Sequence, residues 1–297
     1  MKKGTELRGY NVVVVTPFAK EGEIDEGAYL EIVDRMVDYG ATGIVVSGCT
    51  GEFWAMSLEE RKRLFKLTAD HLSGELKVIC SVMAVTTGEI LELTESAKAV
   101  GADAVMCLPP HGVVPTRREI VHLYRTISET VDIPIMVYNL PARAAINITP
   151  DIVDELADIE NVVAIKESSN NINQIVETIM SAGDRISIFV GYEHGVLPGI
   201  IMGAEGVSSV LPQILGRDAI DLCFYAMSGE IEKARPLQFK AYTVFNGMEG
   251  AGNFPAWFKE AMNQLGYPAG YPRLPQLPLT ANEKAQVTRV LKKLDLL

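Results

Sequence analysis

Eight short, apolar, β-rich segments recur along the first 210 residues, and this recurrence constrains the fold more than any other feature of the chain. Each segment is almost continuously apolar, as in strands buried on both faces of a parallel sheet; a strand with one wet face would alternate. The predicted strands are Asn11–Thr16, Gly43–Ser47, Lys77–Val82, Ala104–Leu108, Pro134–Asn139, Asn161–Lys166, Ser187–Gly191 and Gly206–Val210.

Helical patterns separate these strands. Asp25–Tyr39 ends at Gly40, which is typical of a helix C-terminus, and Ser57–Leu72 opens with the capping-box sequence Ser-Leu-Glu-Glu. Pro150 stands at the expected first helical position of Thr149–Ala157. The remaining helices predicted between strands are Thr87–Val100, Thr116–Thr130, Asn171–Met180 and Glu193–Met202.

Strands that alternate with helices predict βα units and a parallel sheet. Eight such units favour an α/β fold, a (β/α)8 TIM barrel that runs through strand eight over residues 1–211. An open doubly wound sheet is the alternative, but the loop after the first strand has no GxGxxG or GxxxxGK[ST] motif. Residues 212–297 have helical patterns only, and we expect a closing barrel helix and a C-terminal helical extension rather than an independent domain.

Charge and composition narrow the partners. The chain has 27 Lys and Arg against 38 Asp and Glu, a net charge of −11, and no long basic cluster, so no nucleic-acid partner is expected. No apolar run approaches the length of a membrane span, and the N-terminus does not resemble a signal peptide. The four cysteines form no CxxC pair. We therefore expect a cytoplasmic protein with no membrane partner and no structural zinc.

Lys166 is the most informative residue, because it directly follows the apolar stretch Val162–Ile165 at the end of a strand. Active sites of (β/α)8 barrels lie at this end of the strands. A lysine buried there is either paired with a carboxylate, such as Glu167 or Glu193, or it has a lowered pKa and works as a nucleophile. A neutral amine of this kind forms Schiff bases with carbonyl substrates.

Three further features lie at or just after the ends of predicted strands. Tyr138 stands at the matching height on the preceding strand, where its hydroxyl could move protons for a reacting carbonyl. The turn Gly48–Glu52 offers N–H groups and the Thr50 hydroxyl to a carboxylate. Arg143, in the loop after strand five, could hold a second carboxylate or be a surface arginine.

In these residues the chain resembles the dihydrodipicolinate synthase/N-acetylneuraminate lyase family of lysine Schiff-base lyases, over essentially its whole length. The motifs stand in family order: Gly48, Thr50, Gly51 and Glu52; Tyr138, Asn139 and Pro141; Ile165 and Lys166. The resemblance implies that Lys166 forms the Schiff base with pyruvate or a related 2-oxo acid and that Tyr138 transfers protons. It also implies that Cys49 and Thr50 bind the substrate carboxylate and that Ser208 approaches the substrate by its backbone.

Two positions depart from the synthases. There, the position of Cys49 is usually a threonine that links the catalytic tyrosine to a second tyrosine, which a neighbouring subunit supplies from the loop after strand four. That loop, Pro109–Pro115, has no tyrosine here, and His111 is its nearest polar candidate. The proton relay is therefore either missing or rebuilt as Tyr138–Cys49–His111. Arg143 stands where the synthases keep the arginine for their dicarboxylic substrate.

These observations predict a lyase, an aldolase or a dehydratase, that acts on pyruvate or a 2-keto-3-deoxy sugar acid through the Lys166 Schiff base. One alternative is 4-hydroxy-tetrahydrodipicolinate (dihydrodipicolinate) synthase, and another is a catalytically inactive paralogue that only binds a keto acid. The imine is the electron sink, so we expect no cofactor and no metal. The expected partners are a small-molecule 2-oxo acid and, from the resemblance alone, further copies of the chain in a homotetramer.

Overall fold

The eight strands form a closed parallel barrel in the computed structural model, which describes residues 2–248 and 253–297. Each strand pairs with the next, and β8 returns to pair with β1, so the predicted (β/α)8 barrel is confirmed. The strands are β1 Gly9–Val13, β2 Gly43–Val46, β3 Lys77–Ser81, β4 Ala104–Cys107, β5 Ile135–Asn139, β6 Val162–Glu167, β7 Ser187–Val190 and β8 Gly206–Ser209.

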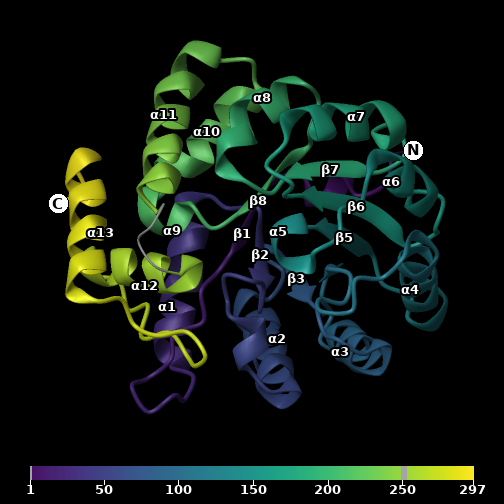
Figure 1. Cartoon of the computed structure of the whole chain (residues 1–297), viewed down its shortest axis with the longest axis horizontal. Coiled ribbons are helices and arrows are strands. Elements are labelled where there is room, and N and C mark those ends of the chain that lie inside the picture. The colour runs from purple at the N-terminus through teal and green to yellow at the C-terminus, as the bar shows by residue number, and fades with distance from the viewer. Residues whose placement is uncertain (1, 249–252) are drawn as a thin grey trace.

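Helices surround the barrel (Figure 1). One principal helix follows each strand: α1 Glu26–Tyr39, α2 Leu58–Leu72, α3 Thr87–Ala99, α4 Arg117–Thr130, α6 Pro150–Leu156, α7 Ile172–Ala182, α8 Val196–Ile201 and α10 Arg217–Met227. Short helical turns lie among them: η1 Thr5–Leu7, η2 Phe53–Ala55, α5 Pro141–Ala144, η3 Glu193–Gly195 and α9 Pro212–Leu215. The C-terminal extension contains α11 Ile231–Gly247, α12 Phe254–Gln264 and α13 Ala281–Lys293.

Successive residues of a strand serve two different cores. In β5, Ile135 and Val137 pack in the large core between barrel and helices, whereas Met136 and Tyr138 pack in the smaller core inside the barrel. Both sides of the strand are therefore apolar, which is why the strands lack alternation in the sequence. The same period of two directs Lys166 to the interior, because Ala164 is an interior residue and Ile165 is not.

The capping signals in the sequence form as predicted. The Ser57 side chain and Glu60 make the reciprocal bonds of a capping box at the start of α2. Gly40 ends α1 in the left-handed conformation with φ 90°, and Pro150 occupies the first turn of α6. Ser57, Glu60 and Gly40 make hydrogen bonds to backbone groups that have no partner within the helix. Pro150 has no backbone N–H and therefore leaves none without a partner.

Some predicted boundaries were wrong. Asn11–Thr16 was predicted as the first strand, but β1 starts at Gly9, where pairing with Gly206 of β8 begins, and ends at Val13. Beyond it Val15 donates its backbone N–H to the side chain of Gln213 instead of a neighbouring strand. The single helix predicted over Glu193–Met202 is a 3-10 turn followed by α8, a division that puts Pro198 in the first turn of α8.

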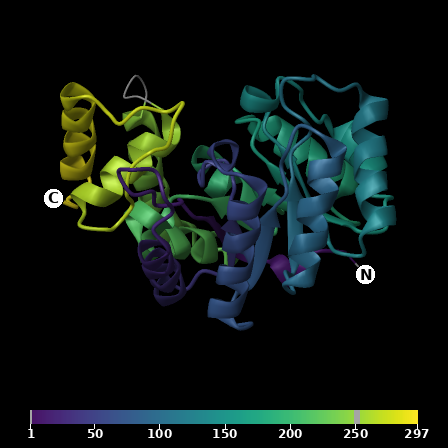
Figure 2. The ribbon, with the colours of Figure 1, turned by 90° about the horizontal axis from the view of Figure 1, so that it is seen from below.

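The C-terminal extension packs beside the barrel. Helix α11 contacts α8 and α10, and α12 contacts α9 and α13. Helices α12 and α13 lie at one side of the molecule, and α3 and α4 lie at the other (Figures 1 and 2). Every helix in the described ranges is too short or too polar to traverse a lipid bilayer.

The seam between β1 and β8 yields a prediction about stability. A Cβ at Gly206 would lie 2.0 Å from the carbonyl oxygen of Gly9. We expect Gly206→Ala to lower the free energy of unfolding by about 1–3 kcal/mol or more, because the barrel wall must open to accept the methyl group. The matched control is Gly88→Ala in α3, where a Cβ meets nothing within 4 Å. Urea unfolding checks both variants, and equal stability of the two would contradict the prediction.

Candidate active site

Lys166 and Tyr138 face each other on neighbouring strands. Strand register pairs the two residues directly, and the Lys166 amine lies 4.4 Å from the centroid of the Tyr138 ring. Both side chains point into the barrel interior and are 4% exposed. The sequence prediction that these residues share one height at the end of β5 and β6 therefore agrees with the geometry.

The two carboxylates that could have paired with Lys166 do not form an ion pair with it. Glu167 faces the opposite side of β6, where it accepts hydrogen bonds from Asn139 at 2.8 Å and Gln174 at 3.0 Å. Glu193 forms no hydrogen bond with Lys166, and only its ionised form raises the pKa of the amine. Among the described residues the amine thus has no salt-bridge partner.

Burial governs protonation at this site. It lowers the pKa of Lys166 to about 8, against the opposing influence of Cys49 and Glu193. At pH 7 such a pKa leaves roughly one amine in ten uncharged, against fewer than about one in a thousand for an ordinary lysine. Burial also raises the pKa of Tyr138, and its hydroxyl interacts with the side chains of Ser168 and Cys49. Tyr138 therefore enters chemistry as a neutral phenol.

A cavity of about 200 Å³ opens above the lysine. Five predicted site residues line it: Cys49, Thr50, Tyr138, Arg143 and Lys166. They come from the loops and ends of β2, β5 and β6, so the closed barrel brings together residues that are far apart in the chain.

The mouth of this cavity combines a cation with aromatic walls. The Arg143 guanidinium lies 5.1 Å from the centroid of the Trp54 ring, which belongs to the short helix η2 after the Cys49–Thr50 turn. Trp54 itself does not line the cavity, whereas Phe245 of α11 and Phe254 of α12 do. The C-terminal extension is thus part of the site wall, a role that sequence reasoning did not predict because its helices follow the last strand.

Two predicted site residues do not line the cavity. Ser208 is fully buried in β8, and its hydroxyl has no hydrogen-bond partner among the described residues; the lining at this strand end comes from Ser209 and Val210. The His111 ring packs edge-on against Phe53, with 5.6 Å between ring centroids. The relay through His111 stays a prediction.

Sequence reasoning missed two residues beside the lysine. Ser168 donates its hydroxyl to the carbonyl of Gly191 at 3.0 Å and is the hydroxyl neighbour of Tyr138. Ser168 follows Lys166 by two positions, which puts both residues on the same face of the strand. This spacing could have identified it from the sequence. Gly191 gives the lysine room: a Cβ there would lie 1.9 Å from Ser168 Oγ and 2.9 Å from Lys166 Cγ.

Glu193 is a buried carboxyl group in the lining of the cavity. It is 2% exposed and begins η3, after Gly191 and Tyr192 at the end of β7. Burial raises its pKa to about 8, and the charge of Lys166 opposes the shift. Near neutral pH this side chain is therefore largely a protonated acid that can donate a hydrogen bond or a proton into the cavity. The described residues, those of the cavity included, contain no group of three or more His, Cys, Asp or Glu side chains that could hold a metal ion.

The raised pKa of Glu193 implies a stability effect with a definite sign. In the unfolded chain this carboxyl ionises near its ordinary pKa of 4.5, but the folded chain holds the proton up to about 8. Folding therefore takes up a proton between these values, and stability is lost as pH rises from about 4.5 to 8. We expect Glu193→Gln to remove this loss, so that the melting temperature of the variant relative to the wild type increases from pH 5 to pH 8.

Thermal melts at several pH values check this expectation. Glu129→Gln, a change at an exposed position of α4, is the control and should show no such pH trend. If the difference in melting temperature between Glu193→Gln and the wild type is the same at all pH values, the raised pKa of Glu193 is contradicted.

Comparison with known proteins agrees with the fold. The family model described as "Dihydrodipicolinate synthetase family" matches residues 6–294. The chain is 34% identical to 4-hydroxy-tetrahydrodipicolinate synthase of Methanocaldococcus jannaschii over 98% of this chain and 100% of the relative. It is 33% identical to the synthase of Aquifex aeolicus, over 98% of both chains.

Solved structures give the same result. The crystal structure of dihydrodipicolinate synthase from Thermotoga maritima matches with a TM-score of 0.93 and 30% identity, over 98% of this chain and 100% of that one. The enzyme from Acinetobacter baumannii, solved in complex with pyruvate, matches with a TM-score of 0.93 and 27% identity, over 98% and 100% of the two chains. The chain therefore belongs to the dihydrodipicolinate synthetase family and is an enzyme of the Schiff-base-forming lyase class.

Proposed function

We propose that the chain is a 4-hydroxy-tetrahydrodipicolinate synthase, which condenses pyruvate, held as a Schiff base on Lys166, with aspartate semialdehyde. Two findings support this function over the sugar-acid lyase that the loop sequences favoured. Relatives with about one third identity along the full chain carry the synthase name. Arg143 also stands at the cavity mouth, where it can meet a second substrate that bears a carboxylate.

The observation that carries the chemistry is a buried amine without a counter-ion. Lys166 has a pKa of about 8 and no ion pair among the described residues, in a cavity large enough for a small keto acid. A lysine kept only for packing would be expected to have a partner carboxylate. An uncharged amine beside a phenol is instead suited to carbonyl addition.

The first stage builds the imine. The lone pair of the neutral Lys166 amine adds to the keto carbon of pyruvate. The nitrogen gives up one proton and the keto oxygen takes up one, which gives a carbinolamine; a second proton moves from nitrogen to this oxygen in the next step. That oxygen then leaves as water and the imine remains. Each step moves a proton, and we assign these transfers to the Tyr138 hydroxyl because the tyrosine ring lies beside the amine. The Ser168 hydroxyl lies beside the phenol and interacts with it.

The second stage forms the carbon–carbon bond. Loss of a methyl proton converts the imine to an enamine, whose terminal carbon attacks the aldehyde carbon of the second substrate, and the aldehyde oxygen takes up a proton. The pyruvate carboxylate is assigned to the Cys49–Thr50 turn, and the carboxylate of the second substrate to Arg143. A guanidinium holds a carboxylate through two parallel hydrogen bonds, which fixes its orientation.

A lyase that cleaves or dehydrates a 2-keto-3-deoxy sugar acid is the second candidate. Glu193 favours it, because a protonated acid inside the cavity can hydrogen-bond to a substrate hydroxyl or protonate one that leaves as water. Cys49 in place of the usual threonine also distinguishes this chain from the synthases. Both candidates use the same Lys166 imine and differ only in the second half-reaction.

Borohydride trapping tests the shared chemistry. With pyruvate present, we expect reduction to leave a fixed mass increase on the peptide that contains Lys166, and Lys166→Ala to lose both the adduct and turnover. Lys259 is an internal control, because its amine is equally buried but is paired with Glu52. An adduct that persists in Lys166→Ala would contradict the proposed mechanism.

Product analysis separates the candidates. Incubation with pyruvate and aspartate semialdehyde should consume both compounds, whereas pyruvate release from a panel of 2-keto-3-deoxy acids would instead identify the sugar-acid lyase. Adduct formation without any turnover would identify the inactive keto-acid-binding paralogue.

Arg143→Lys tests recognition of the second substrate. Lysine keeps the charge but loses the fork of the guanidinium, so we expect KM for aspartate semialdehyde to rise about tenfold, the effect of losing one charge-assisted hydrogen bond. Half-saturation of trapping by pyruvate should hardly move. Arg125→Lys, on the exposed side of α4, is the control. Equal weakening of both substrates would remove Arg143 from this role.

A further inference from the structure

The turn that carries Cys49 and Thr50 begins and ends in disfavoured backbone conformations. Ser47 has φ 57° and Glu52 has φ 59°, and both are left-handed values that residues with side chains rarely adopt. Such conformations persist only where the surroundings hold them. The bonds that hold the two ends of this turn therefore decide where its N–H groups and hydroxyl point.

The Ser47 end is held by a buried arginine of α2. Arg61 donates from Nε to the Ser47 hydroxyl at 3.0 Å, and its two terminal nitrogens donate to the carbonyls of Met83 at 2.7 Å and Ser81 at 2.6 Å. All three guanidinium nitrogens are thus bound. This end of the turn is anchored to the end of β3, inside the barrel layer itself.

The Glu52 end is held from outside the barrel. Its carboxylate is fully buried and forms an ion pair with Lys259 of α12, with 2.5 Å between Oε1 and Nζ and side-chain exposures of 0% and 1%. The second oxygen, Oε2, accepts a hydrogen bond from the backbone N–H of Arg273 at 3.0 Å. Both partners belong to the C-terminal extension, so the active-site turn is bound to residues that follow the last strand.

The partners of Glu52 are fixed in turn. Lys259 also donates to the carbonyl of Tyr271 at 2.8 Å. The amine of Lys259 and the guanidinium of Arg273 lie 4.3 and 4.1 Å from the ring centroid of Phe18, in the loop after β1. The backbone N–H of Tyr271 donates to the carbonyl of Phe18 at 2.9 Å.

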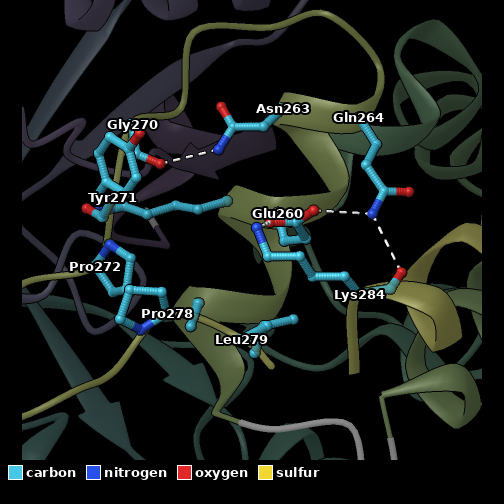
Figure 3. A pocket seen from close by; sticks show the side chains of 11 residues that line it. Glu260, Asn263, Gln264, Gly270, Tyr271, Pro272, Pro278, Leu279 and Lys284 are labelled. Atoms are coloured by element: carbon cyan, nitrogen blue, oxygen red, sulfur yellow. Dashed lines mark hydrogen bonds and ion pairs between the residues drawn. The ribbon is translucent and has the colours of Figure 1, made fainter. Parts of the chain in front are cut away.

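The outer side of α12 is cross-linked as well (Figure 3). There Asn263 donates to the carbonyl of Gly270 at 2.9 Å, and Glu260 pairs with Lys284 of α13 at 2.8 Å. Gln264 donates to both the Glu260 carboxylate and the Lys284 carbonyl. These groups line a cavity of about 350 Å³ but bind one another. The wall therefore belongs to the packing of α12 against α13, and we infer no ligand site there.

We propose that Glu52 is a positioning residue for keto-acid binding: through its buried ion pair with Lys259, the C-terminal extension holds the Cys49–Thr50 turn in the orientation that receives the substrate carboxylate. The proposal rests on the proposed function, in which this turn binds the pyruvate carboxylate above Lys166. Glu52 does not line the cavity and acts through the turn. The extension then shapes the site through the ion pair of Glu52 with Lys259 as well as through Phe245 and Phe254.

The test compares two isosteric changes. Glu52→Gln removes the charge that pairs with Lys259, whereas Glu260→Gln removes the charge of the neighbouring pair with Lys284 and leaves the turn untouched. In borohydride trapping, we expect Glu52→Gln to raise the half-saturating pyruvate concentration by about 10- to 100-fold, the effect of a misplaced binding group. The trapping rate at saturating pyruvate should change little, and Glu260→Gln should resemble the wild type.

Hydrogen exchange supplies a readout that does not depend on pyruvate. We expect backbone amides of residues 47–53 to exchange faster in Glu52→Gln than in the wild type or Glu260→Gln, while peptides from β5 and β6 keep their protection. If the wild type forms no adduct with pyruvate, the proposed function fails. The exchange measurement alone then decides whether the ion pair of Glu52 with Lys259 holds the turn.

A double variant guards against simple unfolding. Loss of one partner leaves a buried charge uncompensated, which is strongly destabilising, whereas loss of both does not. Glu52→Gln combined with Lys259→Met should therefore melt near the wild type and still show the raised half-saturating concentration. Wild-type pyruvate binding and wild-type exchange in a folded variant would overturn the proposal, as would a lower saturating rate with unchanged half-saturation.

Discussion

The burial of one lysine amine at the end of β6 is the constraint on which the site depends. An amine in water ionises near its ordinary pKa of 10.5, and burial of Lys166 lowers this to about 8. That shift requires a closed barrel beneath the amine and side chains around it, and Phe245 and Phe254 from the C-terminal helices supply part of this cover. Strand register then places Tyr138 opposite the amine.

The chain buries two lysines to the same depth with different consequences. Burial lowers the pKa of both Lys166 and Lys259 to about 8. Lys259 meets the Glu52 carboxylate at 2.5 Å and serves as one side of an ion pair, whereas Lys166 has no ion pair among the described residues and faces a cavity. The placement of one carboxylate thus decides whether a buried lysine is ion-paired or faces a cavity without an ion pair. Glu167, next to Lys166 in sequence, faces away from it and accepts hydrogen bonds from the side chains of Asn139 and Gln174.

Sequence reasoning predicted the elements well where a local physical signal exists. Continuous apolar runs identified all eight strands, and the capping box at Ser57 identified the start of α2. The four-residue helices Pro141–Ala144 and Pro212–Leu215 were missed, because a single turn carries no periodicity. The end of the first strand was predicted too late because residues such as Val15 stay buried after strand pairing has ended.

The sequence alone determined the barrel, the family and the pairing of Lys166 with Tyr138, because each follows from the order of apolar runs and from a period of two along a strand. Only the tertiary structure decided that Lys166 lacks an ion pair among the described residues, that Ser168 and Glu193 share its cavity, and that the His111 ring packs against Phe53. It also decided that Glu52 meets Lys259. Whether two distant side chains pair depends on how the helices pack around the barrel, and that packing is set by contacts between segments that no local pattern in the chain records.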